Sequence, residues 1–419
     1  MENEPKPLST STQPRYILSL DGGGMRGIVP AVILDQFAAL LKEAGDERPF
    51  YSHFDLVAGT STGALLSLAL TAPVQRTTLP IGDTKPAHVY GTAQPTFLQK
   101  LMRSKLTPPV LGTIPWGVDM RVLAELYREQ GTTIFPRSQG RLIGQIFVDK
   151  YDEAPLEEFL QNTFGDLLLS EAVVPTLIVA YDSFAGTPYV MRSGLDEGFL
   201  FWEAARASSA APTYFKPAYL RNRIHGQMHG LIDGGVVANN PALYAYIEAK
   251  RLYPNASKYH ILSLSTANRN FAFDTESSRS GVIGWIDPTK GAPIQRIYAS
   301  AQMQIVDDIA SSIDEVSYTR IHSPLPQEYK LDEVSLAALD QMSESAQEIF
   351  DEHKQVLQAY AELLAERTVF DQLTLLDPEA TKPEKQTIVL PKASEKEVLR
   401  PSLDSFLKRI NTLDQEELE

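Results

Sequence analysis

The chain contains, twice near its N-terminal end, a short apolar run that stops in a glycine-rich turn and continues as an apolar helical segment. The first unit is YILSL followed by DGGG and a helical pattern that reaches Gly45, a residue suited to a helix C-terminus. The second is FDLVA followed by GTSTG and ALLSLAL, and further buried strands are predicted in LLSEAVVPTLIVAYD and KYHILSLST. Strands that alternate with helices predict an α/β fold with a mostly parallel central sheet and helices on both faces.

Composition narrows the class of function. Of the 419 residues, 43% are hydrophobic and 22% are charged, which is the balance of a folded globular protein. The formal net charge of −15 repels nucleic-acid phosphates, so we expect no nucleic-acid polymer as a partner. The absence of cysteine excludes disulfides, thiolate metal sites and a cysteine nucleophile. We expect neither a metal nor a cofactor.

The N-terminus predicts a flexible leader over residues 1–14, because three prolines and four Ser or Thr residues occur there. It lacks the apolar core of a signal peptide. We also expect no window to approach the ~20 apolar residues that a bilayer span requires. These observations predict a cytoplasmic protein whose contact with membranes is peripheral.

The remaining chain divides by its pattern. Residues 15–330 are predicted to form one α/β domain with a proline-rich insert at about 73–141. Residues 331–419 are helix-rich and predict a helical C-terminal extension, interrupted by a linker at roughly 376–395. We interpret this extension as an appendage for packing or assembly, and its apolar helices favour a homodimer.

One part of the insert could touch a lipid surface. Residues 97–106 combine five large apolar side chains with three cations, which in so acidic a chain is the best match to an interfacial helix. The same pattern is typical of an amphipathic helix that packs on the sheet, and of the two interpretations we prefer the packed helix.

A serine lies at the second glycine-rich turn. Ser61 is flanked by Gly59 and Gly63 between a predicted strand and a predicted helix. Glycines permit a sharp turn there, which would expose the hydroxyl at the end of the sheet beside a helix N-terminus. The G-x-S-x-G pattern also occurs by chance in Gly/Ser-rich loops. Because a strand is predicted before Ser61 and a helix after it, we favour the interpretation of Ser61 as a nucleophile.

The first glycine-rich turn predicts an anion-binding loop. The N–H groups of Gly22, Gly23 and Gly24 could converge on an anion, as an oxyanion hole or a phosphate cradle requires. The run matches neither dinucleotide nor P-loop motif, although phosphate binding stays open from this loop alone. Arg26 adds a cation that could hold the loop or a developing negative charge.

An aspartate supplies the third part of the predicted site. Asp233 ends the apolar run LIDGG, where a strand terminus would hold it stiffly. Nucleophile, anion loop and positioned carboxylate together are the parts needed for acyl transfer. None of the seven histidines has a convincing loop setting, so a direct Ser61–Asp233 dyad is favoured over a triad.

With these residues in view, the chain resembles bacterial patatin-like phospholipases and is similar to the catalytic domain of cytosolic phospholipase A2. The motifs that carry the resemblance are DGGGMRG (21–27), GTSTG (59–63), ASSAAPTYF (207–215) and DGG (233–235), within roughly residues 15–330. It implies a three-layer fold with Ser61 as nucleophile and Asp233 as base. It also implies the amides of Gly22, Gly23 and Gly24 as the oxyanion hole, with Arg26 as partner of that loop. One departure is ILSLSTA (261–267), where Ser265 and Ala267 stand in place of glycines.

The expected activity is therefore cleavage of fatty-acyl esters, with a phospholipid or another acyl lipid at a membrane surface as substrate. Two alternatives stay open. One is a non-lipid small-ester or thioester hydrolase. The other is a phospholipase effector of bacterial antiviral defence that a cyclic nucleotide activates.

Overall fold

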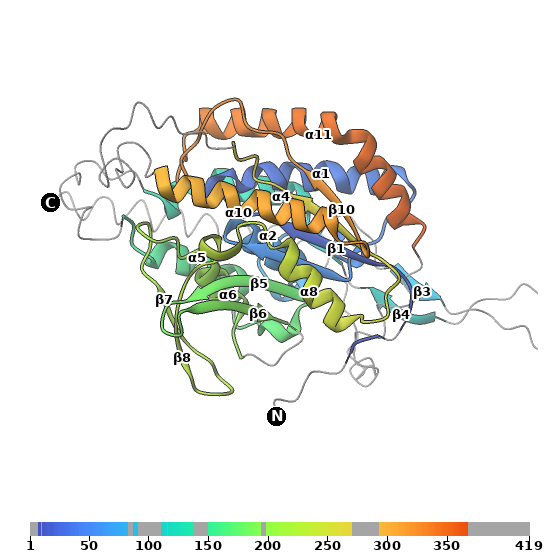
Figure 1. The fold of residues 1–419 in the computed structure, drawn as a ribbon, viewed down its shortest axis with the longest axis horizontal. Coiled ribbons are helices and arrows are strands. Elements are labelled where there is room, and N and C mark those ends of the chain that lie inside the picture. The colour runs from blue at the N-terminus through green and yellow to red at the C-terminus, as the bar shows by residue number, and fades with distance from the viewer. Residues whose placement is uncertain are drawn as a thin grey trace, which may run out of the picture. The chain divides into compact units, whose positions relative to one another are not determined.

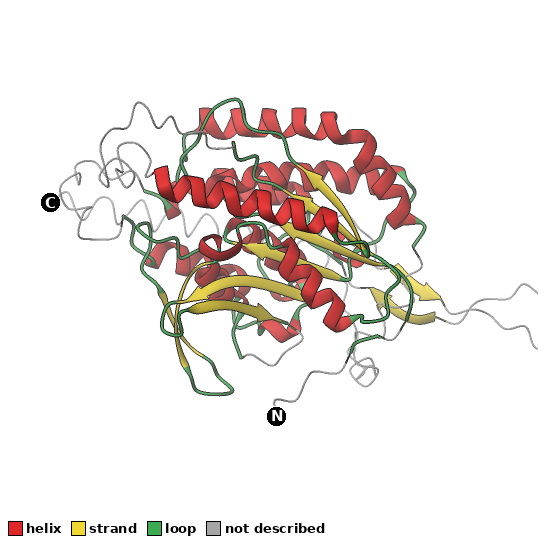
Figure 2. Cartoon of the chain, viewed as in Figure 1, coloured by secondary structure: helices red, strands yellow, loops and turns green. Residues whose placement is uncertain are grey.

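The structure is a computed structural model, and it describes residues 7–9, 11–82, 87–90, 110–114, 116–136, 150–193, 198–269 and 293–367. All of these residues belong to one compact unit, Met1–Leu376, while the second unit, Asp377–Glu419, lies outside the described residues. Figures 1 and 2 show strands in the middle of the described unit, with helices on both sides of them.

The central sheet has eight strands, namely β1 (Arg15–Leu20), β2 (Leu56–Thr60), β5 (Thr176–Asp182), β6 (Thr187–Arg192), β7 (Ala218–Arg221), β8 (Met228–Asp233), β9 (Tyr259–Leu264) and β10 (Val316–Ile321). Their order is β10-β9-β1-β2-β5-β8-β7, and β6 pairs with β5. The strands from β10 to β5 are parallel to one another, β6 and β8 each pair antiparallel with β5, and β7 pairs antiparallel with β8. The predicted mostly parallel sheet is confirmed.

Helices cover both faces of this sheet, which confirms the predicted three layers. One face carries α7 (Gly235–Ala238), α8 (Ala242–Leu252) and α10 (Pro293–Ser312). The other carries α1 (Ile28–Glu43), α2 (Thr62–Thr71), α4 (Met120–Ile134), α5 (Ala154–Phe164), α6 (Phe201–Ser208) and α11 (Leu336–Ala365). Successive side chains of β1 alternate between the two cores, because Ile17 packs with the α8 layer and Leu18 with the α1 layer. A separate antiparallel pair consists of β3 (Ala87–Tyr90) and β4 (Val110–Ile114).

Helix α1 corrects one expectation from the sequence. Together with the turn before it, Gly24–Glu43 is long and apolar enough to cross a membrane by length and composition alone. In this fold the apolar composition of α1 is explained by packing, because α1 contacts both the core on the sheet and helix α11. A helix that packs against two neighbours has a wider apolar surface than one that packs on a single face.

Helix α11 lies within the predicted C-terminal extension, yet it belongs to the same compact unit as the sheet. Its residues Met342, Leu357 and Leu364 are buried in the core that α1 shares. Beyond its end, Arg367 forms an ion pair with the buried carboxylate of Asp55. The core of the protein therefore continues well past residue 330. The predicted linker at 376–395 and the helix after it lie outside the described residues.

The described part of the predicted leader is held against the body. The Leu8 N–H donates to Leu252 O at 2.9 Å, and the Ser257 N–H donates to Thr12 O at 3.0 Å. These two hydrogen bonds fix part of the segment that the sequence predicted to be a flexible leader. Residues 97–106, for which the sequence left both a packed helix and a lipid-contacting helix open, lie outside the described residues.

The position of α11 in the shared core leads to a stability prediction. Leu357→Ala should lower the free energy of unfolding by about 2–5 kcal/mol, because the side chain is fully buried and its truncation leaves a cavity. Val356→Ala is the matched control, since this neighbouring side chain is 48% exposed and its loss should cost less than about 0.5 kcal/mol. Denaturant unfolding followed by near-UV circular dichroism measures both. An unchanged main transition in Leu357→Ala would show that α11 is an independent appendage.

Candidate active site

Strand β5 brings Ser61 and Asp233 together. Because β6 pairs along almost the whole of one edge of β5, β2 and β8 must share the other edge. On that edge the last residue of β2, Thr60, lies opposite Val179, and the last residue of β8, Asp233, lies opposite Ala180. The two strands run in opposite directions, so their C-terminal ends meet at adjacent positions of β5. Ser61, which follows β2 directly, therefore lies beside Asp233.

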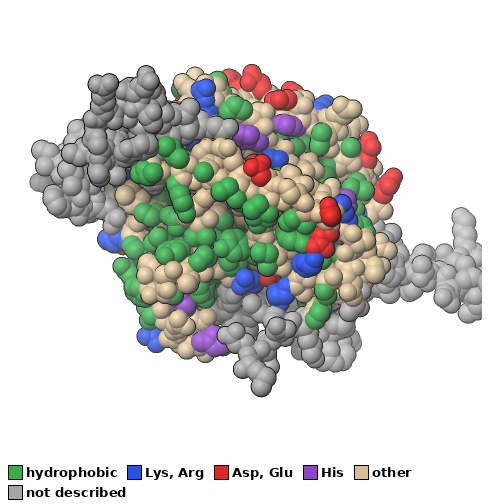
Figure 3. Space-filling model, in the orientation of Figure 1, with side chains coloured by type: hydrophobic (Ala, Val, Ile, Leu, Met, Phe, Trp, Pro, Cys, Tyr) green, Lys and Arg blue, Asp and Glu red, His purple; other side chains and the backbone are tan. Residues whose placement is uncertain are grey.

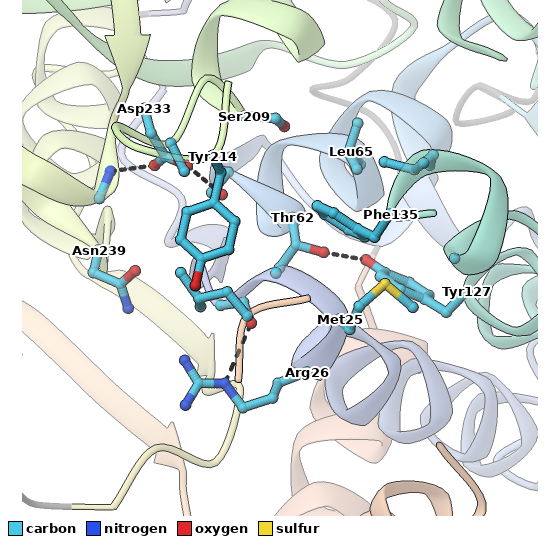
Figure 4. Close-up of a pocket in the computed structure, with 18 of the residues that line it drawn as sticks. Met25, Arg26, Thr62, Leu65, Tyr127, Phe135, Ser209, Tyr214, Asp233 and Asn239 are labelled. Atoms are coloured by element: carbon cyan, nitrogen blue, oxygen red, sulfur yellow. Dashed lines mark hydrogen bonds between the residues drawn. The ribbon is translucent and has the colours of Figure 1, made fainter. Parts of the chain in front are cut away.

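The two side chains are in hydrogen-bond contact. Ser61 Oγ donates to Asp233 Oδ2 at 2.7 Å, and the Gly235 N–H donates to Asp233 Oδ1 at 2.6 Å. Burial raises the pKa of Asp233 to about 6, although both hydrogen bonds act to lower it. Figure 4 shows this carboxylate with its two hydrogen bonds. At neutral pH the group is largely ionised and is a better proton acceptor than an ordinary aspartate.

Ser61 has the strained backbone that the glycine-flanked turn predicted. Its φ of 54° and ψ of −122° are rare for a residue with a side chain, a strain of the order of 1–3 kcal/mol. The Ser61 N–H donates to Ser208 Oγ at 2.8 Å, and the Ser208 hydroxyl donates to Val179 O at 2.6 Å. These bonds link the turn to β5 and offset part of the strain.

The two flanking glycines are required by close approach of the backbone. A Cβ atom on Gly63 would lie 2.2 Å from Leu20 O, and one on Gly59 would lie 2.2 Å from Gly63 O. Both distances are far below van der Waals contact. Because Gly59 and Gly63 have no side chains, α2 can begin directly against the end of β1, where the glycine loop starts.

The glycine loop supplies two amides to the site rather than three. Gly23 and Gly24 line the cavity that contains Ser61 and Asp233, and among the described residues their N–H groups have no protein acceptor. The prediction for Gly22 is wrong in this respect. Its N–H donates to Asn239 O at 2.9 Å, and it does not line the cavity. The amide is therefore occupied by the backbone that follows α7.

Arg26 lies in the short 3₁₀ turn Gly24–Gly27 and lines the same cavity. Its Nε donates to Gly23 O at 3.2 Å, so it contacts the glycine loop as the resemblance implied. Burial lowers the pKa of Arg26 to about 10, and it stays protonated at neutral pH. Figure 4 shows its guanidinium on the same side of the cavity as Tyr214 and Asn239.

Several groups that hold this loop were not found in the sequence. Thr266 Oγ1 and Asn239 Nδ2 both donate to Gly22 O, at 2.7 and 3.1 Å. Arg320 on β10 donates to both carboxylate oxygens of buried Asp21, at 2.8 and 2.6 Å. No local pattern marks Thr266, Asn239 or Arg320 as partners of this loop, since each comes from a strand or loop that only the fold brings close.

The departure from the family pattern at residue 267 does not remove the glycine-like backbone there. Ala267 has a left-handed φ of 55°, a conformation that glycine adopts more easily.

A cavity of about 1230 Å³ opens at the site. Its exposed lining residues mark the mouth, and they are Pro212, Thr213, Arg269, Tyr298, Glu328 and Lys330. Most of its deeply buried lining is aliphatic and aromatic, and includes Leu66, Leu79, Leu123, Leu156, Leu160 and Phe164 from α2, α4, α5 and the segment between them. The cavity thus joins a polar end at Ser61 to an apolar arm beneath α4 and α5. Figure 4 shows Leu65, Tyr127 and Phe135 on the side away from Asp233.

Other chemistry is not assembled in the described part of the chain. None of the histidines whose side chains the structure describes lines this cavity. Within those residues there is also no group of three or more His, Asp or Glu side chains that could hold a metal ion.

Comparison with known proteins places this chain in a family. The family model described as patatin-like phospholipase matches residues 18–246. Patatin-like protein 2 of Arabidopsis thaliana is 28% identical over 358 residues, covering 77% of this chain and 79% of that protein. Patatin-08 of Solanum tuberosum is 25% identical over 394 residues, covering 84% and 90%. The match to the structure of VipD from Legionella pneumophila covers 83% of this chain and 71% of that one, at 12% identity and with a TM-score of 0.30.

The chain belongs to the patatin-like phospholipase family, because that match spans more than half of it. Membership supports lipid acyl hydrolase activity in the broad sense.

The raised pKa of Asp233 predicts that the ionised carboxylate, which the site needs as a base, lowers the stability of the fold. A carboxyl group whose pKa rises on folding, here from about 3.9 to about 6, stabilises the fold at low pH and loses that contribution as pH rises through 6. Asp233→Asn keeps a neutral group that can accept from Gly235 N–H and donate to Ser61 Oγ. It should therefore be more stable than the parent at pH 8 by up to about 3 kcal/mol, with the difference vanishing below about pH 4. Unfolding at both pH values measures this, and a pH-independent difference would contradict it.

Proposed function

We propose that the protein hydrolyses fatty-acyl esters of lipids, as a phospholipase A or a lysophospholipase, through the dyad of Ser61 and Asp233. The observation that carries this proposal is the 2.7 Å contact between the Ser61 hydroxyl and the Asp233 carboxylate at one end of a large apolar cavity. A serine nucleophile is activated by an adjacent general base, and the Gly235 N–H orients that base here.

In the first half-reaction, Asp233 Oδ2 accepts the Ser61 proton while Ser61 Oγ forms a bond to the ester carbonyl carbon. The carbonyl π electrons move onto its oxygen and give a tetrahedral oxyanion. When this intermediate collapses, the ester C–O bond breaks, and the leaving alcohol or lysolipid takes the proton from Asp233. The acyl group is then an ester of Ser61.

In the second half-reaction, water attacks the acyl-serine while Asp233 accepts one of its protons. Collapse releases the fatty acid and returns a proton to Ser61 Oγ. The same carboxylate thus alternates between base and acid, for which a pKa near 6 is well suited.

The developing oxyanion would be stabilised by the amides of Gly23 and Gly24. They line the cavity beside Ser61 and are not used by other acceptors among the described residues. A preorganised donor of this kind contributes about 3–4 kcal/mol to the transition state. Arg26 supports this role through its bond to Gly23 O, and its charge favours a negative group nearby.

The cavity favours a long acyl chain over a small ester. Its volume of about 1230 Å³ exceeds that of pockets for typical small molecules, which are roughly 300–1,000 Å³. Its buried end presents apolar side chains, so a fatty-acyl chain would leave water there while the carbonyl stays at Ser61.

Loss of either dyad member should abolish hydrolysis. Ser61→Ala and Asp233→Asn should each lower kcat for a chromogenic acyl ester and for phospholipid by about 10⁴-fold or more, because the two groups act as a unit.

In the parent, kcat/KM should fall about tenfold per pH unit below about pH 6, where Asp233 becomes protonated. Initial rates from pH 4 to 8 give both results. Assays with and without a cyclic dinucleotide test whether such an activator is needed. Substantial turnover by either variant would refute the dyad.

A substitution in the apolar arm tests the assignment of lipid substrate. Ala69 lines the arm on α2, eight residues or ~12 Å along the helix from Ser61. Ala69→Phe should narrow the arm and lower kcat/KM for palmitoyl esters by about tenfold or more, while butyryl esters react normally. Ala69→Ser preserves the space and serves as the control. Equal losses for both chain lengths would favour a small-ester hydrolase or a damaged fold.

A further inference from the structure

The outward face of α10 is apolar. Four large side chains are exposed along it, namely Ile294 (49%), Tyr298 (61%), Ile305 (55%) and Ile309 (45%). At 3.6 residues per turn these positions fall within roughly 60° of one another, so they form one stripe along the helix. We call these four side chains the α10 stripe. Figure 3 shows apolar side chains gathered on the face of the molecule where α10 lies.

The stripe is not needed to fold the helix onto the sheet. The opposite side of α10 supplies the packing, because Ala310 is buried and Val306 packs with the core beneath α8. A surface helix of a globular protein is normally polar on its outer face. Contiguous exposed apolar groups of this kind usually mark an interaction surface.

Few charges interrupt the stripe. Among the described side chains of α10, Arg296 is ion-paired with Glu328, and Asp307 accepts a hydrogen bond from Tyr318 on β10. Asp308 is the remaining charged residue and is exposed. The partner of this surface must therefore be recognised through apolar contact rather than through charge.

The stripe adjoins the mouth of the active-site cavity. Five residues of α10 line that cavity, and they are Arg296, Tyr298, Ala299, Ser300 and Met303. Tyr298 belongs both to the cavity lining and to the stripe. A molecule that covers the stripe therefore also lies next to the opening through which a substrate would pass.

We infer that the α10 stripe docks the protein onto the surface of a phospholipid bilayer. The inference rests on the proposed function, since an enzyme that hydrolyses bilayer phospholipids takes its substrate from a membrane surface. A bilayer against the stripe places lipid at the cavity mouth, whereas a second copy of the chain on the same face would cover it. The net charge of −15 opposes adsorption to anionic membranes, so the apolar stripe suits a zwitterionic surface.

The test compares two matched triple variants. One is Ile294→Ser, Ile305→Ser and Ile309→Ser, which spares Tyr298 because that residue lines the cavity. The control is Leu336→Ser, Val356→Ser and Leu363→Ser, which removes exposed apolar side chains (64%, 48% and 38%) from α11, across the sheet from α10. Binding to phosphatidylcholine vesicles is measured by co-sedimentation in a Ser61→Ala background, so that the vesicles are not consumed.

The α10 triple variant should bind the vesicles at least about tenfold more weakly than its parent, because three apolar side chains no longer leave water. The α11 control should bind as the parent does, and binding should persist in 1 M salt. In the Ser61-containing background, both triple variants should hydrolyse a soluble butyryl ester at the parental rate, which verifies the fold and the site.

Four outcomes would overturn the inference. They are unchanged vesicle binding by the α10 variant, an equal loss in the α11 control, binding that needs anionic lipid and disappears in salt, or a lipid-free dimer that the α10 variant converts to monomer. The last would make this face a contact between two copies. If the parent hydrolyses no ester, the proposed function fails, while the vesicle measurements still decide whether α10 docks.

Discussion

The hydrogen bond between Ser61 and Asp233 is the interaction on which the site depends, and one strand edge produces it. Strand β5 holds β2 and β8 end to end on that edge, so two residues far apart in sequence come to adjacent positions. Ser208 fixes the Ser61 amide to the same strand through Val179. The geometry is therefore set by backbone pairing in the sheet and requires little from side-chain flexibility.

The environment of this hydrogen bond decides its chemistry. Burial makes the Asp233 carboxylate costly to ionise, and that same cost raises its pKa toward neutral pH. The strained turn at Ser61 is a second local cost. Both are tolerated because the surrounding sheet and two helical layers over-determine the conformation, which is how proteins commonly maintain reactive groups.

The exposed α10 stripe, the cavity mouth and the cavity adjoin one another, as the proposed amphiphilic substrate would require. An apolar helix face adjoins the opening, polar groups including Arg26 lie near Ser61, and the buried arm beneath α4 and α5 is lined mainly by hydrocarbon. Such a sequence of environments matches a molecule with a polar head, an ester and a long chain. A small soluble ester would need neither the arm nor the exposed stripe.

Much of the fold and the central parts of the site could be predicted because their signals are local. Apolar runs and glycine turns determined the parallel strands, and residues around Ser61 and Asp233 carry their own turn chemistry. The sequence did not reveal that Gly22 gives its amide to Asn239, nor that Arg320 on β10 holds Asp21. The composition also predicted that α11 belongs to a separate extension, whereas this helix is part of the core. These features depend on strand order and register, which set distances between remote segments and leave no periodic trace along the chain.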